Sequence, residues 1–162
     1  MDSTSFFKQG DIPPTAFFFE VAFIGNGNNK MDSFFQEVSG LKATVENLEK
    51  REGGDNVFVH HLPKSIKYEN LVLKRCLSKS EDLEKWCRDT IENFEFKPLD
   101  IRLRLVSSKS EANEGLAMVP LAEWFFEQAF PVSWEITFLG NPKSGLLIET
   151  LALKYKSFTK TV

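Results

Sequence analysis

Two histidines and two cysteines are the residues of this chain best suited to chemistry. His60 and His61 are the only histidines among 162 residues, and imidazole serves readily as a metal ligand or general base. Because neighbours on a strand point to opposite faces, these two side chains do not easily share one metal. We expect two half-exposed strand residues, with metal ligation or general-base work as the alternative. Cys76 and Cys87 are eleven residues apart, which fits no zinc or redox motif.

The glycine-containing motifs give no catalytic arrangement either. Gly25-Asn26-Gly27 follows an expected strand, but the sequence after it lacks the third glycine and the helix start of a dinucleotide-binding loop. A turn is the better interpretation. Cys87 falls on the apolar stripe of an expected helix, where core packing is the usual role, and the carboxylates are spread along solvated faces. We therefore predict no catalytic residue, no metal site and no cofactor.

The charge balance argues against a nucleic-acid binder. Lys and Arg number 20 against 23 for Asp and Glu, which gives a net charge of -3. An electropositive surface could be lined by Lys74-Arg75 and by Arg102 with Arg104. Isolated charge pairs, however, usually only face the solvent on the outer side of a strand. No apolar run approaches the ~18 residues of a membrane span. The N-terminus has neither the cationic start nor the apolar stretch of a secretory signal, so reduced cysteines are expected.

The elements that would position these residues are mostly strands. Extended segments are expected at residues 17–24, 34–46, 57–59, 68–77, 99–106, 124–138 and 146–158, roughly seven strands. The clearest is 99–106, where leucine or isoleucine alternates strictly with charged residues. Residues 25–29 and 141–145 predict turns, and the polar run 107–115 predicts a loop.

A single helix is expected over residues 80–94. Ser78 and Glu81 match a capping box, and Pro98 stops any continuation. The apolar residues on one stripe at helical spacing are Leu83, Trp86, Cys87, Ile91 and Phe94.

This order of elements predicts a mainly β fold with one helix, of the α+β class, built as an antiparallel β-sandwich or barrel. A single domain would cover residues 17–158, between an N-terminal arm at 1–16 and a C-terminal tail at 159–162. The 16 phenylalanines, against 2 tyrosines and 3 tryptophans, indicate a wide apolar face buried between layers or subunits.

Seven sequence blocks together resemble one known family. They are VSGL (38–41), REGGDN (51–56), FVHHLP (58–63), KYENLVLKR (67–75), EKWCRDTIENFEFKP (84–98), AFPVSW (129–134) and IETLALKY (148–155). In their order and spacing, from about residue 14 to 158, the chain resembles the tail tube proteins of contractile-tailed phages and phage-like contractile injection systems. Lys64 and Cys76 stand where many relatives have glycine, so a locally different backbone or register is expected there.

The resemblance implies a tail-tube (Hcp-like) subunit that forms hexameric rings, which stack into a hollow tube inside a contractile sheath. The implied partners are further copies of the chain, stacked tube rings, and the baseplate and sheath proteins of the same particle, with room for cargo in the lumen. It implies no specific nucleic-acid site and no membrane insertion. The protein would be made in the bacterial cytoplasm without a signal peptide and found in the assembled tail or particle.

Within the family, REGGDN, FVHHLP and WCRDTIENFEF look closer to tube-initiating members at the baseplate than to the main shaft subunit, which is the alternative. The polar loop and the N-terminal arm could supply the unequal ring face that an initiator needs. Two other classes of protein, an enzyme and a ligand-binding β-barrel, are the alternatives to a tube protein. An enzyme lacks any triad, metal set or phosphate loop, and a free-standing ligand-binding β-barrel would be a monomer with a dry cavity.

The segment 46–62 is the expected contact between subunits. It is long for a hairpin connection and carries a Gly-Gly hinge before a short apolar strand. A mobile surface hairpin is the alternative interpretation. The contact candidates are Arg51, Glu52, Gly53, Gly54, Val57, Phe58 and Val59.

Overall fold

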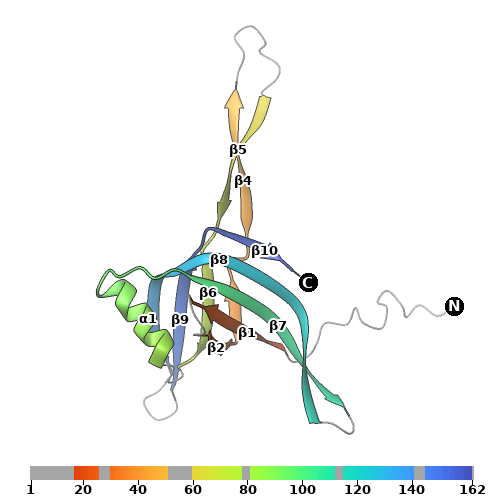
Figure 1. The fold of residues 1–162 in the computed structure, drawn as a ribbon, viewed down its shortest axis with the longest axis vertical. Helices are drawn as coiled ribbons and strands as arrows, with labels where there is room; N and C mark the ends of the chain where they lie inside the picture. Colours follow the sequence, from red (N-terminus) through yellow and green to blue (C-terminus); the bar gives the residue numbers. More distant parts are fainter. Residues whose placement is uncertain are drawn as a thin grey trace, which may run out of the picture.

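The computed structural model describes residues 17–25, 30–50, 60–77, 81–111, 115–140 and 145–161. These ranges hold ten strands and one helix (Figure 1). In chain order they are β1 (Phe17–Ile24), β2 (Lys30–Phe35), β3 (Glu37–Ser39), β4 (Ala43–Lys50), β5 (His60–Tyr68), β6 (Leu71–Cys76), α1 (Glu81–Ile91), β7 (Leu99–Glu111), β8 (Gly115–Leu139), β9 (Leu146–Lys154) and β10 (Ser157–Lys160).

The main sheet curves into a barrel. Its strand order is β2-β1-β7-β8-β9-β6-β3, and β10 pairs with β8 in addition. All pairings between its described strands are antiparallel. The strands at the two ends, β2 and β3, are separated in sequence only by Gln36, whose amide donates to the Lys74 carbonyl at 2.9 Å. One stretch of chain therefore closes the sheet by leaving β1 and joining β6. The predicted class, a mainly β antiparallel fold with one helix, is confirmed.

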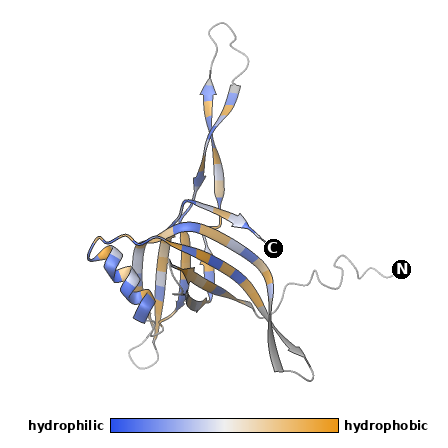
Figure 2. Cartoon of the chain, viewed as in Figure 1, coloured by the Kyte–Doolittle hydropathy of each residue, from blue (hydrophilic) through white to orange (hydrophobic). Residues whose placement is uncertain are grey.

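Strict alternation along the strands builds the core. Figure 2 shows hydrophobic and hydrophilic bands alternating along β7 and β8, because successive side chains point to opposite faces of a strand. The inward set fills the barrel, and its largest fully buried members are Phe23, Phe35, Phe126, Leu71, Leu73, Ile101, Leu103, Leu151 and Leu153.

Helix α1 lies on the outside of the barrel and contacts β8 (Figure 1). Its buried residues are Leu83, Trp86, Cys87 and Thr90, and the Trp86 ring lies 5.6 Å from that of Phe23. The helix is shorter than the predicted 80–94. Phe94 has left the helical conformation, with φ at +58°, and Ile91 is half exposed.

Several predicted boundaries are wrong where strands lengthen through partner contacts. Residues 107–111 are not a loop, because they continue β7 and pair in register with 115–119 of β8. The expected strand 124–138 is likewise the C-terminal part of one 25-residue strand, Gly115–Leu139. The last expected strand divides into β9 and β10, and the expected tail 159–162 begins inside β10. A polar sequence remains extended here because a neighbouring strand satisfies its backbone hydrogen bonds.

The expected strand 34–46 is also divided, into parts of β2, β3 and β4. After β3 the chain leaves the barrel, and β4 and β5 form a separate two-stranded antiparallel sheet. Figure 1 shows this hairpin projecting from the barrel. The expected N-terminal arm, the capping residue Ser78 and the strand at 57–59 lie outside the described residues.

An ion pair lies in the core between β6 and β9. Arg75 and Glu149 are 5% and 3% exposed, and Arg75 Nε lies 2.6 Å from Glu149 Oε2. The indole N–H of Trp134 donates to Glu149 Oε1 at 2.9 Å, and the guanidinium lies 5.0 Å from the centre of the Phe35 ring. The expectation that the side chains of Lys74-Arg75 only face the solvent is therefore wrong for Arg75. Alternation along β6 places this side chain on the same inward face as Leu71 and Leu73.

Candidate assembly surfaces

The residues first considered for chemistry do not converge. His61 is exposed on β5, and His60 begins the same strand. Cys87 is fully buried, and burial together with the Glu149 carboxylate raises the pKa of its thiol to about 12. That thiol is therefore protonated at neutral pH and is a poor nucleophile. Within the described ranges no three His, Cys, Asp or Glu side chains are grouped to hold a metal ion.

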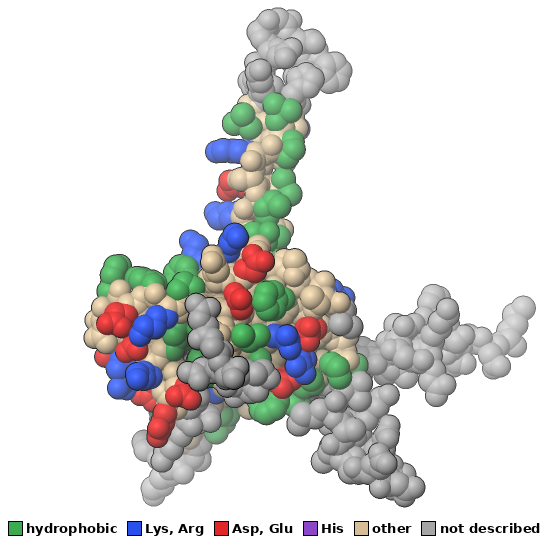
Figure 3. All heavy atoms as spheres, viewed as in Figure 1, with side chains coloured by type: hydrophobic (Ala, Val, Ile, Leu, Met, Phe, Trp, Pro, Cys, Tyr) green, Lys and Arg blue, Asp and Glu red, His purple; other side chains and the backbone are tan. Residues whose placement is uncertain are grey.

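The β4–β5 hairpin presents apolar side chains that nothing in the described subunit covers. Val45 is paired with Ile66 and Leu48 with Leu62, and all four are about half exposed. Figure 3 shows hydrophobic side chains along one edge of this hairpin and charged ones along the other. An isolated two-stranded hairpin is marginally stable in water, so a hairpin of this composition is suited to packing against another surface.

The base of the hairpin is firmly attached to the barrel. Lys42 Nζ lies 2.6 Å from Glu69 Oε1, and the Glu69 amide donates to the Lys42 carbonyl at 3.1 Å. The Tyr68 ring contacts the rings of Tyr155 and Phe158 at 5.7 and 5.6 Å between centroids. These contacts fix the direction in which the hairpin leaves the barrel.

The register of the hairpin shifts once, between Glu46 and Asn47. Glu46 pairs with Ser65 and Asn47 with Pro63, which leaves Lys64 as the unpaired bulge residue. Bulges increase strand twist and redirect side chains. A locally different backbone or register was expected at Lys64, and this residue coincides with the bulge. The same was expected at Cys76, which is paired regularly with Ile148 at the end of β6.

A second exposed apolar region lies on both faces of the sheet where β8 ends and β9 begins. Phe138 is opposite Leu147 and Leu139 opposite Leu146, and the Leu77 amide donates to the Leu147 carbonyl at 2.8 Å. All five side chains are between 41% and 58% exposed. An apolar cluster of this kind marks an interaction surface more often than an isolated exposed leucine does.

Opposite the core, a charged row crosses β1, β7 and β8. Arg104 NH1 lies 3.3 Å from Glu20 Oε2, and Arg104 Nε lies 3.1 Å from Glu123 Oε2. The three residues are directly aligned by the strand register. The two ion pairs make this row polar, in contrast to the two apolar surfaces.

The seven predicted contact residues, from Arg51 to Val59, lie outside the described residues. Of the apolar residues of β4 and β5 that flank them, Leu48 and Leu62 lie within the expected contact segment 46–62, whereas Val45 and Ile66 lie outside it and were not predicted as contacts. Their signal was present in the sequence, because Val45, Leu48, Leu62 and Ile66 interrupt otherwise polar strands. The structure adds that these strands have no core of their own. Across the described part of the chain, no helix has the length and apolar character needed to cross a membrane.

Comparison with known proteins identifies the family. The family model of the T4-like virus tail tube protein gp19 matches residues 15–159. Among solved structures, a chain from the anti-feeding prophage (AFP) baseplate, 6-fold symmetrised, is 27% identical. It has a TM-score of 0.75 and covers 92% of this chain and 95% of that chain. No curated protein sequence matches.

Two more distant structures share the fold. A chain from the sheath-tube complex of the extracellular contractile injection system PVC is 20% identical, with a TM-score of 0.67, and covers 94% of this chain and 93% of that one. The crystal structure of an Hcp protein is 12% identical, with a TM-score of 0.57, and covers 88% and 91%. This chain belongs to the tail tube protein family, as its sequence blocks predicted.

Proposed function

We propose that this protein is a structural subunit without catalytic activity that forms a hexameric ring, the ring that starts the inner tube at the baseplate of a contractile particle. The observation that carries this proposal is the 27% identity to a chain from a six-fold symmetrised baseplate. The sequence blocks that look closer to initiator-type members support the same position in the particle.

The exposed apolar surfaces support assembly with further copies and with other particle proteins. A ring needs a heterologous interface that repeats by rotation, and stacking needs a second contact along the axis. The β4–β5 hairpin, with the candidates Arg51, Glu52, Gly53, Gly54, Val57, Phe58 and Val59 beyond its described strands, supplies a segment that reaches a neighbouring subunit or ring. The partners are the next tube ring, the baseplate and the sheath.

The filled barrel makes the ligand-carrier alternative unfavourable. Large side chains, including Phe23, Phe35 and Phe126, occupy the interior that a carrier would leave open for a ligand. A carrier would also be a monomer, so the mass of the purified protein distinguishes the two functions.

The location of the chain in intact particles tests the initiator function. In electron cryomicroscopy of purified particles, density for this chain should occupy only the ring or rings next to the baseplate. Density repeated along the whole shaft would assign it to the main tube instead.

Deletion of residues 52–59 tests the contact segment. The variant should remain folded, because the barrel core lies elsewhere, and should no longer assemble. Triple alanine substitution at Glu135, Thr137 and Lys154, which are strand residues outside the hairpin, is the control and should leave assembly intact. Rings or tubes formed by the deletion variant would contradict the assignment of this segment.

A further inference from the structure

An aromatic corner projects from the C-terminal end of α1. We define the aromatic corner as Ile91, Phe94, Phe96 and Phe130. The Phe94 side chain is 79% exposed, and its ring lies 4.8 Å, edge-on, from that of Phe96. The Phe96 ring in turn lies 5.5 Å from that of Phe130 on β8. The corner is therefore a continuous apolar surface of three rings, remote from the β4–β5 hairpin in the fold (Figure 1).

Phe94 occupies an unfavourable backbone conformation. Its φ of +58° lies in the left-handed region, where a β-carbon crowds the following carbonyl and where glycine is the usual residue after a helix. The exposed ring gains little from burial within the subunit. Strained residues of this kind are concentrated at functional sites, where another interaction gives the side chain its use.

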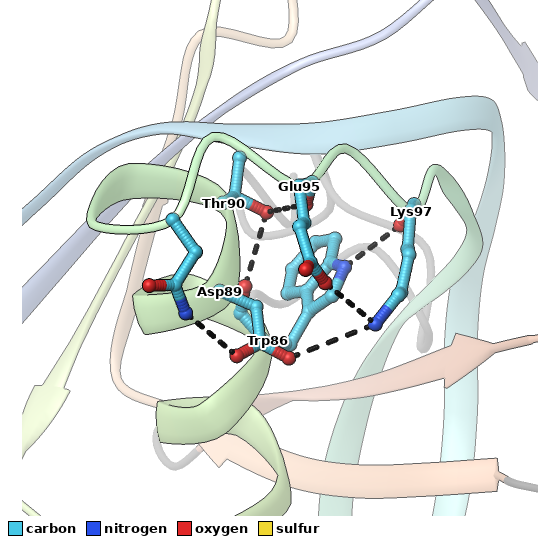
Figure 4. A network of polar contacts seen from close by, with 6 residues as sticks. Trp86, Asp89, Thr90, Glu95 and Lys97 are labelled. Carbon is cyan, nitrogen blue, oxygen red and sulfur yellow. Dashed lines mark hydrogen bonds and ion pairs between the residues drawn. The ribbon is translucent and has the colours of Figure 1, made fainter.

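Hydrogen bonds hold the segment that carries the aromatic corner (Figure 4). The Trp86 indole N–H donates to the Lys97 carbonyl at 2.8 Å, and the Glu95 amide donates to the Asp89 carbonyl at 3.0 Å. The Thr90 hydroxyl lies 3.0 Å from the Trp86 carbonyl and 3.3 Å from that of Glu95. The corner is therefore preorganised, which lowers the entropy lost when a partner binds it.

The surroundings of the corner are acidic. Residues 81–97 contain six carboxylates and three basic side chains. Arg88 is already paired with Glu84, and Lys97 Nζ lies 3.3 Å from Glu95 and 3.8 Å from Asp89. The excess negative charge favours a partner surface that carries Lys or Arg.

We propose that the aromatic corner is a docking site for a particle protein other than this chain, one whose surface offers an apolar pocket rimmed by Lys or Arg. This inference rests on the proposed function, because a ring inside a particle has other proteins around it. Two corners would not bind each other, because each carries the same acidic helix and the contact would oppose like charges. A contact between the corner and a different surface of a second copy is the alternative that the cross-linking experiment distinguishes.

Photo-crosslinking in assembled particles tests the docking site. The photoreactive analogue p-benzoylphenylalanine is placed at position 94 of this chain, and particles assembled with it are purified and irradiated. The expected product joins this chain to one other particle subunit, at a peptide that contains Lys or Arg. The charge-reversing substitution Glu92→Lys should lower its yield at least threefold. The matched control places the analogue at Phe34 on β2, 51% exposed, and should not give that product.

The outcomes separate the docking site from the proposed function. Immunoblotting first establishes whether this chain is in the purified particles. Its absence would overturn the proposed function and the docking site together. If the chain is present, the docking site alone is overturned by cross-links to a second copy, by no cross-link from position 94, by the same product from position 34, by a cross-linked peptide without Lys or Arg, or by an unchanged yield with Glu92→Lys.

Discussion

A β-carbon on Gly40 would lie 1.8 Å from the backbone carbonyl oxygen of Asn70. Gly40 has a φ of +86° and directly follows the short strand β3, where the chain turns out of the barrel toward the β4–β5 hairpin. Asn70 lies where the chain returns from the hairpin into β6. The chain segments at Gly40 and Asn70 are thus close enough that only glycine fits at position 40. This contact sets where the hairpin begins.

Gly40→Ala should therefore destabilise the base of the hairpin. The left-handed backbone alone costs about 1 kcal/mol with a side chain present, and relief of the clash requires the backbone to move as well, so we expect a loss of at least about 2 kcal/mol in urea unfolding. Ser39→Ala, at the exposed neighbouring residue, is the control and should change stability by less than about 0.5 kcal/mol. Equal stability of the two variants would show that the close approach has no energetic role.

The buried ion pair predicts a large effect of one substitution. Glu149→Ala removes the partner of Arg75 and leaves an unpaired charge in the core, which should lower the free energy of unfolding by about 3–5 kcal/mol. Glu37→Ala breaks the exposed pair with Lys74, the neighbour of Arg75, and is the matched control, with an expected loss below about 1 kcal/mol. Similar losses in chemical denaturation would contradict the difference in burial.

The Cys87 thiol predicts a loss of stability at alkaline pH. Burial raises its pKa from 9.0 to about 12 in the folded protein, so above pH 9 the unfolded chain releases this proton more readily. The free energy of unfolding should then fall between about pH 9 and 12, by roughly 1 kcal/mol per pH unit. Below about pH 9 the thiol is protonated in both the folded and the unfolded chain, so its titration should not change the free energy of unfolding there.

Urea unfolding at pH 8 to 11 measures this slope. Cys87→Ala should make it shallower, and the residual slope includes Tyr155, whose pKa burial also raises, to about 12. Cys76→Ala removes the other thiol and is the control. An identical slope in the Cys87→Ala protein would exclude the thiol as a cause.

The strain at Phe94 predicts a stabilising substitution. Phe94→Gly relieves the left-handed conformation and loses only a surface ring contact, so the melting temperature of the isolated protein should rise by about 2–4 °C for about 1 kcal/mol. Phe96→Gly, two residues on, is the control and should not stabilise. A melting temperature lowered by Phe94→Gly would mean that the aromatic corner contributes to folding.

The sequence predicted best where a local pattern and burial agree. Alternation over 99–106 gave a strand with Ile101 and Leu103 in the core, because the middle of one face of that strand is fully buried. It failed at Phe94, which has helical spacing but lies beyond the helix, and at Arg75, whose charge suggested solvent although Glu149 compensates it inside. At Phe94, hydrogen bonds from Trp86 to Lys97 and from Glu95 to Asp89 hold the chain just beyond the helix. At Arg75, the deciding contact with Glu149 is distant in sequence.

The assembly surfaces were less predictable for the same reason. The long segment 46–62 indicated a contact, but the exposure of Ile66 or Leu139 follows only from how the strands leave the barrel. Polar residues 107–111 were expected in a loop because their pairing with β8 is not visible in their composition.

Electron microscopy of the isolated protein at micromolar concentration tests both self-assembly and the initiator function. We expect six-fold rings or short stacks of a few rings, because an initiating ring needs one face for the tube and another for the baseplate. Spontaneous long tubes would contradict the initiator function and leave the shaft subunit in its place. A monomer of 18.5 kDa that forms no rings would contradict self-assembly itself.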